Sequence, residues 1–274
     1  MCRWIAYAGP PVRLDTLLFQ PENSLISQSL HATRGVPTNG DGFGLGWYGE
    51  RPFPGLYRDI LPAWNDTNLR SLSEQVRARL FFAHVRASTG TATSRENCHP
   101  FTHENLLFMH NGRIGGYDRI RRRLEGMVAD EFYAIRRGTT DSELFFLMAL
   151  SNGLMEEPIV AIARTIRQVR REMAAQNIAA PFRMTAALSD GERVLAIRTS
   201  SDGASPSLFH ASGGELVSEG RQIRLTPGRG TVMVLSEPLD NEEFWHEVPE
   251  DHVLETRHGE ARVRPLPLEL VGAD

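Results

Sequence analysis

The sequence predicts an α+β fold with antiparallel sheets, and three observations favour this fold class. Apolar stretches of strand length come first, helical patterns occupy the middle of the chain, and strand patterns return after them. Strands and helices therefore do not alternate as they do in a parallel α/β fold. No internal repeat or low-complexity linker interrupts the 274 residues, so we expect a single domain over residues 1–274.

The first part of the chain combines predicted strands with short helices. Residues 4–8 have the composition of a buried strand, and residues 14–19 and 24–32 have helical patterns. In residues 40–49 apolar residues alternate with glycine, which is typical of a strand that another backbone approaches closely. Residues 80–85 and 106–109 are further apolar runs of strand length.

Residues 44–49 also match the G-x-G-x-x-G pattern of dinucleotide-binding loops. That interpretation requires a helix to begin directly after the glycines, so that its N-terminus meets the pyrophosphate. The next residues are Glu50-Arg51-Pro52-Phe53-Pro54, which do not begin such a helix. We therefore expect these glycines to permit close packing between strands and not to bind a cofactor.

Two helices are predicted in the middle of the chain, over residues 141–150 and 156–176. Thr140-Asp141-Ser142-Glu143 precedes the first and predicts a capping box, with Thr140 as N-cap and Glu143 at the third helical position. This motif also fixes Asp141 in the first helical turn, where it could receive a ligand's ammonium group. Strands follow at 183–188, 194–199, 231–235 and 252–255, separated by turn residues.

Composition and charge exclude several classes of protein. A formal net charge of −4 argues against nucleic-acid binding, which usually requires a strongly basic face. No run of about 18 apolar residues is present, so no transmembrane helix is expected, and the first residues are too poor in apolar residues for a secretory signal. Only two cysteines occur, Cys2 and Cys98. A disulfide scaffold is therefore excluded, and we expect a reduced, cytoplasmic setting.

The functional prediction depends most on Cys2. A cysteine at this position could simply fill a small gap in the core. However, an initiator methionine before a small residue is commonly removed, and removal of Met1 would leave a free α-amine beside the Cys2 thiol. The amine titrates near about 8 and the thiol near about 8.5, so one residue could supply both nucleophile and general base.

Three other motifs permit both a structural and a functional interpretation. His99 and His103 lie four apart, but Pro100 disfavours a helix and no third ligand is evident, so we interpret them as surface or hydrogen-bonded histidines and expect no metal. Asn111-Gly112 taken alone indicates a hairpin turn, and the alternative is a pair of fixed hydrogen-bond donors. Arg86 ends a predicted strand and would ordinarily be solvated, although its planar fork suits a carboxylate ligand.

Together these motifs resemble the class II glutamine amidotransferases, which are N-terminal nucleophile (Ntn) hydrolases. The matching pieces occur in the family's order over roughly residues 1–150: Met1-Cys2, Arg34-Gly35 with Asp41-Gly42-Phe43-Gly44, residues 84–90 (H-V-R-A-S-T-G), residues 97–101 (N-C-H-P-F), His110-Asn111-Gly112 and Thr140-Asp141-Ser142-Glu143. The opening residues and residues 97–101 are most similar to a stand-alone branch that includes the ergothioneine-pathway γ-glutamyl hydrolase. The resemblance implies a four-layer αββα sandwich with two antiparallel sheets.

The resemblance also implies a role for each site residue. Cys2 would attack the γ-carbonyl of a glutamine-like side chain, and Asn111 and Gly112 would form the oxyanion hole. Arg86, assisted by Thr89, would bind the substrate α-carboxylate, and Asp141 would bind its α-ammonium group. No metal and no organic cofactor would be required.

Two positions depart from the family pattern. Arg3 follows the nucleophile where synthase members usually have glycine, and Ala87 follows Arg86 where several members have an aromatic residue. These departures suggest that contacts to the leaving group and closure of the site differ in this chain.

We therefore predict an N-terminal-cysteine amidohydrolase that cleaves the γ-amide of glutamine or of a γ-glutamyl compound through a γ-glutamyl thioester. No synthase domain follows in this sequence, so the alternative is the glutaminase subunit of a two-protein amidotransferase or peptidase complex, weakly active alone. A further alternative is a non-catalytic γ-glutamyl-binding or structural protein that has kept the fold. The expected partners are a small γ-glutamyl substrate and, in the second case, a partner protein, but neither nucleic acid nor a membrane.

Overall fold

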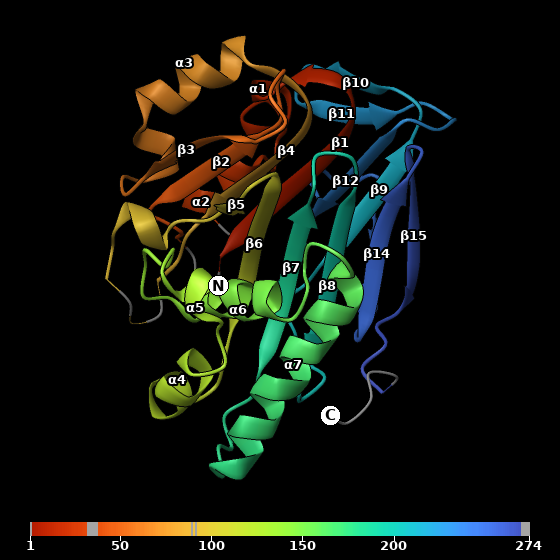
Figure 1. Cartoon of the computed structure of the whole chain (residues 1–274). Helices are drawn as coiled ribbons and strands as arrows, with labels where there is room; N and C mark the ends of the chain where they lie inside the picture. The colour runs from red at the N-terminus through yellow and green to blue at the C-terminus, as the bar shows by residue number, and fades with distance from the viewer. Residues whose placement is uncertain (1, 32–37, 89, 91, 270–274) are drawn as a thin grey trace.

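The computed structural model describes residues 2–31, 38–88, 90 and 92–269, and these residues form two large antiparallel sheets (Figure 1). The larger sheet has β1 at its centre, between β12 and β4. Its seven strands lie in the order β13 (His246–Glu247), β9 (Phe209–Gly213), β12 (Thr231–Leu235), β1 (Arg3–Arg13), β4 (Arg77–Val85), β2 (Phe43–Trp47) and β3 (Gly55–Asp59). Cys2 therefore lies at the end of the central strand.

The second sheet has six strands, again all antiparallel. Their order is β15 (Glu260–Pro265), β14 (His252–Arg257), β8 (Val194–Ser200), β7 (Arg183–Ser189), β6 (Leu106–Arg113) and β5 (Phe101–His103). A separate hairpin is formed by β10 (Leu216–Glu219) and β11 (Gln222–Leu225).

Helices cover the outer face of each sheet. The helices of the seven-stranded sheet are α1 (Asp15–Leu18), α2 (Leu25–Leu30) and α3 (Thr67–Gln75). Those of the six-stranded sheet are α4 (Tyr117–Glu125), α5 (Asp130–Tyr133), α6 (Asp141–Ser151) and α7 (Pro158–Ala175), and Figure 1 shows α6 and α7 in front of β6, β7 and β8. Two short 3₁₀ turns, η1 (Ala63–Asn65) and η2 (Arg95–Asn97), lie in the connections.

Three hydrophobic clusters separate these elements into four layers. One cluster fills the space between the sheets and includes Trp4, Phe82, Leu107 and Val234. The others lie between each sheet and its helices. Neighbouring residues of β4 alternate between clusters, with Phe81 facing the helices and Phe82 facing the other sheet, as the period-two geometry of a strand requires. The predicted αββα sandwich is confirmed.

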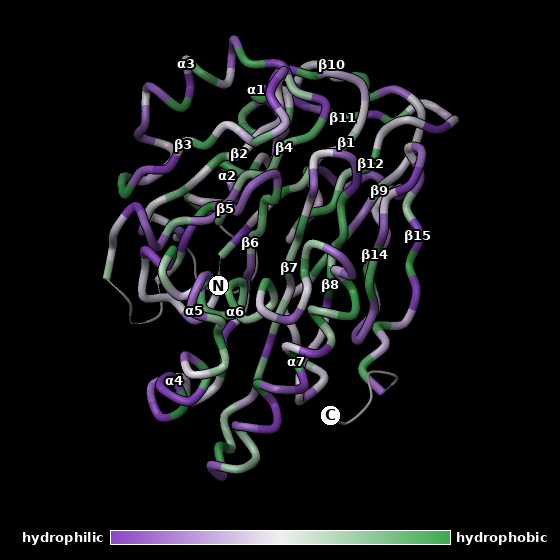
Figure 2. Tube along the Cα trace, in the orientation of Figure 1, coloured by the Kyte–Doolittle hydropathy of each residue, from purple (hydrophilic) through white to green (hydrophobic). Residues whose placement is uncertain are grey.

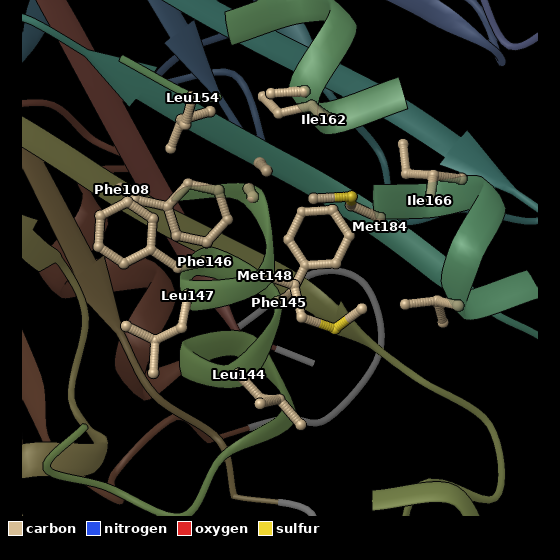
Figure 3. Close-up of a cluster of buried hydrophobic side chains, with 14 of the residues drawn as sticks. Phe108, Leu144, Phe145, Phe146, Leu147, Met148, Leu154, Ile162, Ile166 and Met184 are labelled. Carbon is tan, nitrogen blue, oxygen red and sulfur yellow. The ribbon is translucent and has the colours of Figure 1, made fainter. Parts of the chain in front are cut away.

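Helix α6 lies in the middle of the cluster on the six-stranded sheet and is buried on nearly every side. Figure 3 shows Phe146 against Phe108 of β6, and the two rings stack with centroids 5.1 Å apart. Phe145 lies beside Met184 of β7 and near the helix α7 that carries Ile162 (Figure 3). Burial of each such side chain contributes about 1.5–3 kcal/mol. By contrast, the trace of α4 is mostly hydrophilic in Figure 2, because this helix buries only one narrow stripe.

The predicted N-cap of α6 is confirmed, and the capping box closes in a modified form. The Thr140 hydroxyl accepts a hydrogen bond from the Glu143 N–H at 3.1 Å. The Glu143 carboxylate accepts the N–H groups of Arg137 and Gly138, at 2.8 and 2.7 Å. The motif thus fixes the turn before the helix as well as its first residue, Asp141.

The glycine-rich segment forms β2, and its glycines permit close approach as predicted. A Cβ on Gly44 would lie 1.9 Å from the His99 carbonyl oxygen, and one on Gly46 would lie 2.6 Å from Leu107 Cδ2. The next element after β2 is the strand β3, so no helix begins there.

Asn111 and Gly112 lie within β6, so the interpretation of this pair as a hairpin turn is wrong. The strand continues to Arg113 because β7 pairs with it from Leu107 through Arg113, which lies opposite Arg183. Gly112 has φ +155°, and a Cβ there would lie 1.9 Å from the Arg183 carbonyl oxygen. Glycine is therefore required by the neighbouring strand and not by a turn.

Candidate active site

A cavity of about 290 Å³ lies at the end of the sandwich where β1 begins. Five of the six site residues predicted from the sequence line it: Cys2, Arg86, Asn111, Gly112 and Asp141. They come from the start of β1, the end of β4, the second half of β6 and the first turn of α6. Thr89 lies outside the described residues, as do Met1, Arg34 and Gly35 of the quoted motifs.

The Cys2 thiol lies against the backbone of Ala87. Its sulfur accepts the Ala87 N–H at 3.4 Å and lies 3.6 Å from the Ala87 carbonyl oxygen. Burial raises the pKa of the Cys2 thiol, and the Ala87 N–H together with the positive charges of Arg86 and Arg3 offsets only part of this rise. Because the thiolate is the nucleophilic form, a base beside the sulfur is needed at neutral pH.

Arg3 does not line the cavity, although it directly follows Cys2. Its guanidinium donates to the Glu237 carboxylate, with Nε 2.7 Å from Oε1, and each side chain is only 3% exposed. Its Nη1 also donates to the Cys2 carbonyl oxygen at 3.0 Å. Where synthase members usually have glycine, this chain therefore has an arginine that fixes the backbone of Cys2.

Arg86 is held at the cavity by the segment that precedes β2. Its N–H donates to the Gly42 carbonyl oxygen, and its own carbonyl accepts the Asp41 N–H. The guanidinium donates to the Asp41 carbonyl oxygen at 3.1 Å and to Ser88 Oγ at 3.2 Å. The Asp41 carboxylate in turn accepts the Ser88 N–H at 2.7 Å. The Asp41-Gly42 motif thus positions a nearly buried arginine.

Asp141 is fixed from two directions. It begins α6, where the positive end of the helix dipole stabilises a carboxylate. Its Oδ2 accepts the Ile114 N–H at 2.8 Å, which ties α6 to the segment that follows β6. The carboxylate therefore keeps a set position in the cavity wall.

Asn111 is nearly buried, yet its side-chain amide has no hydrogen-bond partner among the described residues. Neither amide atom is among the fully buried unpartnered polar atoms of the described chain, so the amide faces the open cavity and can donate to a ligand atom there. β5 pairs with β6 only from Leu106 to Phe108. Within the described chain, one edge of β6 beyond Phe108 thus lacks a neighbouring strand, and the backbone near Gly112 borders the cavity.

Three buried imidazoles lie beside and behind these residues. His99 and His110 line the cavity, and the His84 ring lies against that of His99, tilted by 38° with centroids 4.4 Å apart. Burial lowers the pKa of His84 to about 3 and also lowers the pKa of His99 and of His110. The imidazoles therefore stay neutral at physiological pH. His110 Nδ1 lies 2.7 Å from Ser142 Oγ.

The interpretation of His99 as a surface or hydrogen-bonded residue is wrong. It is 4% exposed, and neither ring nitrogen has a hydrogen-bond partner within the described part of the chain. The reason is tertiary, because the strand β2 and the ring of Phe101 cover it. His103 is half-buried with its ring at the edge of Phe132. Among the described residues no three His, Cys, Asp or Glu side chains form a group suited to a metal ion.

Several other residues of the cavity wall were not predicted from the sequence. His110 directly precedes Asn111 and Ser142 directly follows Asp141, so their positions beside predicted site residues could have indicated them. Arg113 lies two residues after Asn111 on the same strand. Arg183 lies on β7 and nothing in its local sequence indicates the site.

Comparison with known proteins supplies the family. The family model described as "Glutamine amidotransferases class-II" matches residues 20–267. The chain belongs to the class II glutamine amidotransferases. Its sandwich is that of the Ntn amidotransferase domains, as the resemblance implied.

Three relatives of this family member cover almost all of its chain. It is 35% identical to the probable glutamine amidotransferase DUG3 of Saccharomyces cerevisiae, over 97% of this chain and 84% of that protein. It is 27% identical to the gamma-glutamyl-hercynylcysteine sulfoxide hydrolase of Mycolicibacterium smegmatis, over 97% of this chain and 100% of that protein. The structure of a glutamine aminotransferase class-II domain protein from Silicibacter pomeroyi is similar with a TM-score of 0.74 at 35% identity, covering 97% of this chain and 99% of that one.

No helix of the described chain is both long enough and apolar enough to cross a membrane.

Proposed function

We propose that the protein is a thiol-dependent amidohydrolase that cleaves the γ-amide of glutamine or of a γ-glutamyl compound through a γ-glutamyl thioester on Cys2. The observation that carries this proposal is the meeting of a thiol, a buried arginine, a fixed carboxylate and an unpartnered amide in one cavity. A γ-glutamyl group carries one carbonyl, one carboxylate and one ammonium group, and the cavity offers a matching group for each.

Substrate binding follows from the charges of the wall. Arg86 receives the α-carboxylate, because a buried guanidinium forms strong two-pronged hydrogen bonds with this group. Asp141 receives the α-ammonium group at the start of α6. A ligand that lacks either charge leaves its partner desolvated and unpaired, so it is rejected.

The chemistry follows from Cys2 once Met1 has been removed. The free α-amine takes the thiol proton, and the sulfur attacks the γ-carbonyl carbon. Asn111 Nδ2 and the Gly112 N–H stabilise the negative charge that develops on the carbonyl oxygen. The amine then passes its proton to the leaving nitrogen, the C–N bond breaks, and a γ-glutamyl thioester remains. Water, deprotonated by the same amine, attacks the thioester and releases glutamate and the Cys2 thiol.

Relatives support this reaction class. The hydrolase from Mycolicibacterium smegmatis is named for a γ-glutamyl substrate, and its match covers 97% of the chain described here. The two-protein alternative remains a prediction, and it requires turnover to rise when a second protein is added.

The test is release of glutamate from L-glutamine and from γ-glutamylglycine by purified protein. Intact mass must first establish that Met1 is absent. Cys2→Ala should abolish turnover. Cys98→Ser is the matched control, because Cys98 is fully buried and is not part of the cavity wall. Turnover that survives in Cys2→Ala, or a purified chain that retains Met1 at full activity, would refute the mechanism.

A further inference from the structure

The cavity wall carries two more arginines than a γ-glutamyl head group uses. Among the described residues of its wall, three are arginines, Arg86, Arg113 and Arg183, and Asp141 is the one acid. Arg86 and Asp141 match the carboxylate and the ammonium of the head group. The remaining two arginines lie opposite each other on β6 and β7, as Cα partners in the ladder.

The two arginines of this pair differ in how their charge is balanced. Arg183 donates two parallel hydrogen bonds to Asp202, with Nε 3.2 Å from Oδ1 and Nη2 2.6 Å from Oδ2. The Arg113 side chain is exposed, and its guanidinium forms neither an ion pair nor a hydrogen bond with any described residue. Like charges placed directly opposite each other in a sheet destabilise the pairing. Asp202 removes that cost for Arg183 and leaves Arg113 as the unbalanced cation of the cavity.

Arg113 lies at a defined place relative to the reacting carbonyl. Residues two apart on a strand point to the same face, so Arg113 shares a face with Asn111. The two Cα atoms are separated by about 6.6 Å along the strand. Asn111 is assigned to the carbonyl oxygen, and Arg113 is the exposed residue of the cavity wall one strand repeat further along β6.

We propose that Arg113 binds a carboxylate on the leaving half of the substrate, so that the preferred substrates are γ-glutamyl α-amino acids. In these compounds the leaving amine carries its carboxylate one carbon away from the scissile bond. Glutamine and neutral γ-glutamyl amides lack this group and are poorer substrates. The inference rests on the proposed function, because it uses the same cavity and the same orientation of the scissile amide.

The test compares γ-glutamylglycine with γ-glutamylglycinamide, which differ in one charge on the leaving group. The wild-type kcat/KM for γ-glutamylglycine should exceed that for the glycinamide by about 10- to 100-fold, the range of a charge-assisted hydrogen bond. Arg113→Gln should reduce kcat/KM for γ-glutamylglycine by the same factor and leave the glycinamide unchanged. Arg113→Lys keeps the charge without the fork and should fall between. Arg79→Gln is the control, since Arg79 is an exposed strand arginine outside this cavity and should alter neither substrate.

Binding to the Cys2→Ala variant separates this inference from the proposed reaction. Calorimetry with γ-glutamylglycine and γ-glutamylglycinamide should give the same preference without turnover, and Cys2→Ala combined with Arg113→Gln should lose it. Equal affinity for the two ligands overturns the role of Arg113, whether or not the wild type hydrolyses them. A preference for γ-glutamylglycine without hydrolysis by the Met1-free wild type supports Arg113 and overturns the amidohydrolase instead.

Discussion

The buried ion pair between Arg3 and Glu237 offers the sharpest test of how the backbone at Cys2 is held. Both side chains are 3% exposed, and the residues lie 234 positions apart in the chain. The change to make is Glu237→Leu, which removes one charge and leaves the Arg3 guanidinium buried. Its remaining contacts include the hydrogen bond to the Cys2 carbonyl oxygen.

The expected cost follows from the burial. A buried ion loses several kcal/mol of hydration, which its partner offsets through attraction of about 4 kcal/mol at an effective dielectric near 20. Removing one partner of such a pair destabilises the fold by about 3–5 kcal/mol. Arg3→Leu should cost a similar amount, because it leaves the Glu237 carboxylate buried without the Arg3 charge. The double variant Arg3→Leu/Glu237→Leu removes both charges of the pair. Its loss of stability should therefore be about 2–3 kcal/mol smaller than the sum of the losses of the two single variants.

Urea unfolding of the four proteins measures this coupling. With a typical slope of about 2–3 kcal/mol per molar urea, each single variant should lower the midpoint by about 1–2 M. The control is Glu219→Leu, which breaks an ion pair with Arg224 that is more than half exposed on both sides and should cost less than about 1 kcal/mol. Single variants within 1 kcal/mol of wild type, or a double variant equal to the sum of the singles, would refute this account of Arg3.

Three further predictions concern the site and its surroundings. Asn111→Ala should lower kcat by about 10²–10³ with little change in KM, measured by glutamate release, because an oxyanion donor acts mainly in the transition state. Gly112→Ala should destabilise the protein by about 2–4 kcal/mol in urea unfolding, since its Cβ meets the Arg183 carbonyl oxygen at 1.9 Å, whereas Gly49→Ala, with no atom within 4 Å, should not. The pKa of His84 is about 3 in the fold and about 6.5 in the unfolded chain, so the unfolded state binds a proton first and stability falls as the pH drops below about 6.5. His84→Leu should reduce that fall by about 1.4 kcal/mol per pH unit between pH 5.5 and 4; an unchanged slope would exclude a neutral, buried His84.

Local signals in the sequence were enough for the elements that build most of the site. Helical periodicity and the Thr140 cap located α6, whose observed bounds, Asp141–Ser151, differ from the prediction by one residue. Apolar runs located β1, β4, β6 and β7. The helix α3 was not predicted, and neither were short strands such as β3, β5 and β13. A short strand is stabilised by pairing with a neighbour and not by its own sequence.

The sequence by itself determined the fold class, the family resemblance and the candidates Cys2, Arg86, Asn111, Gly112 and Asp141, because capping, periodicity and ordered motifs depend on residues close together in the chain. Only the tertiary structure decided that these residues share one cavity. It also placed Gly112 in a strand, buried His99, paired Arg3 with Glu237 and set Arg113 opposite Arg183. Each of these results depends on which distant segment lies alongside, and that choice is made by sheet order and packing between layers, which no short stretch of sequence encodes.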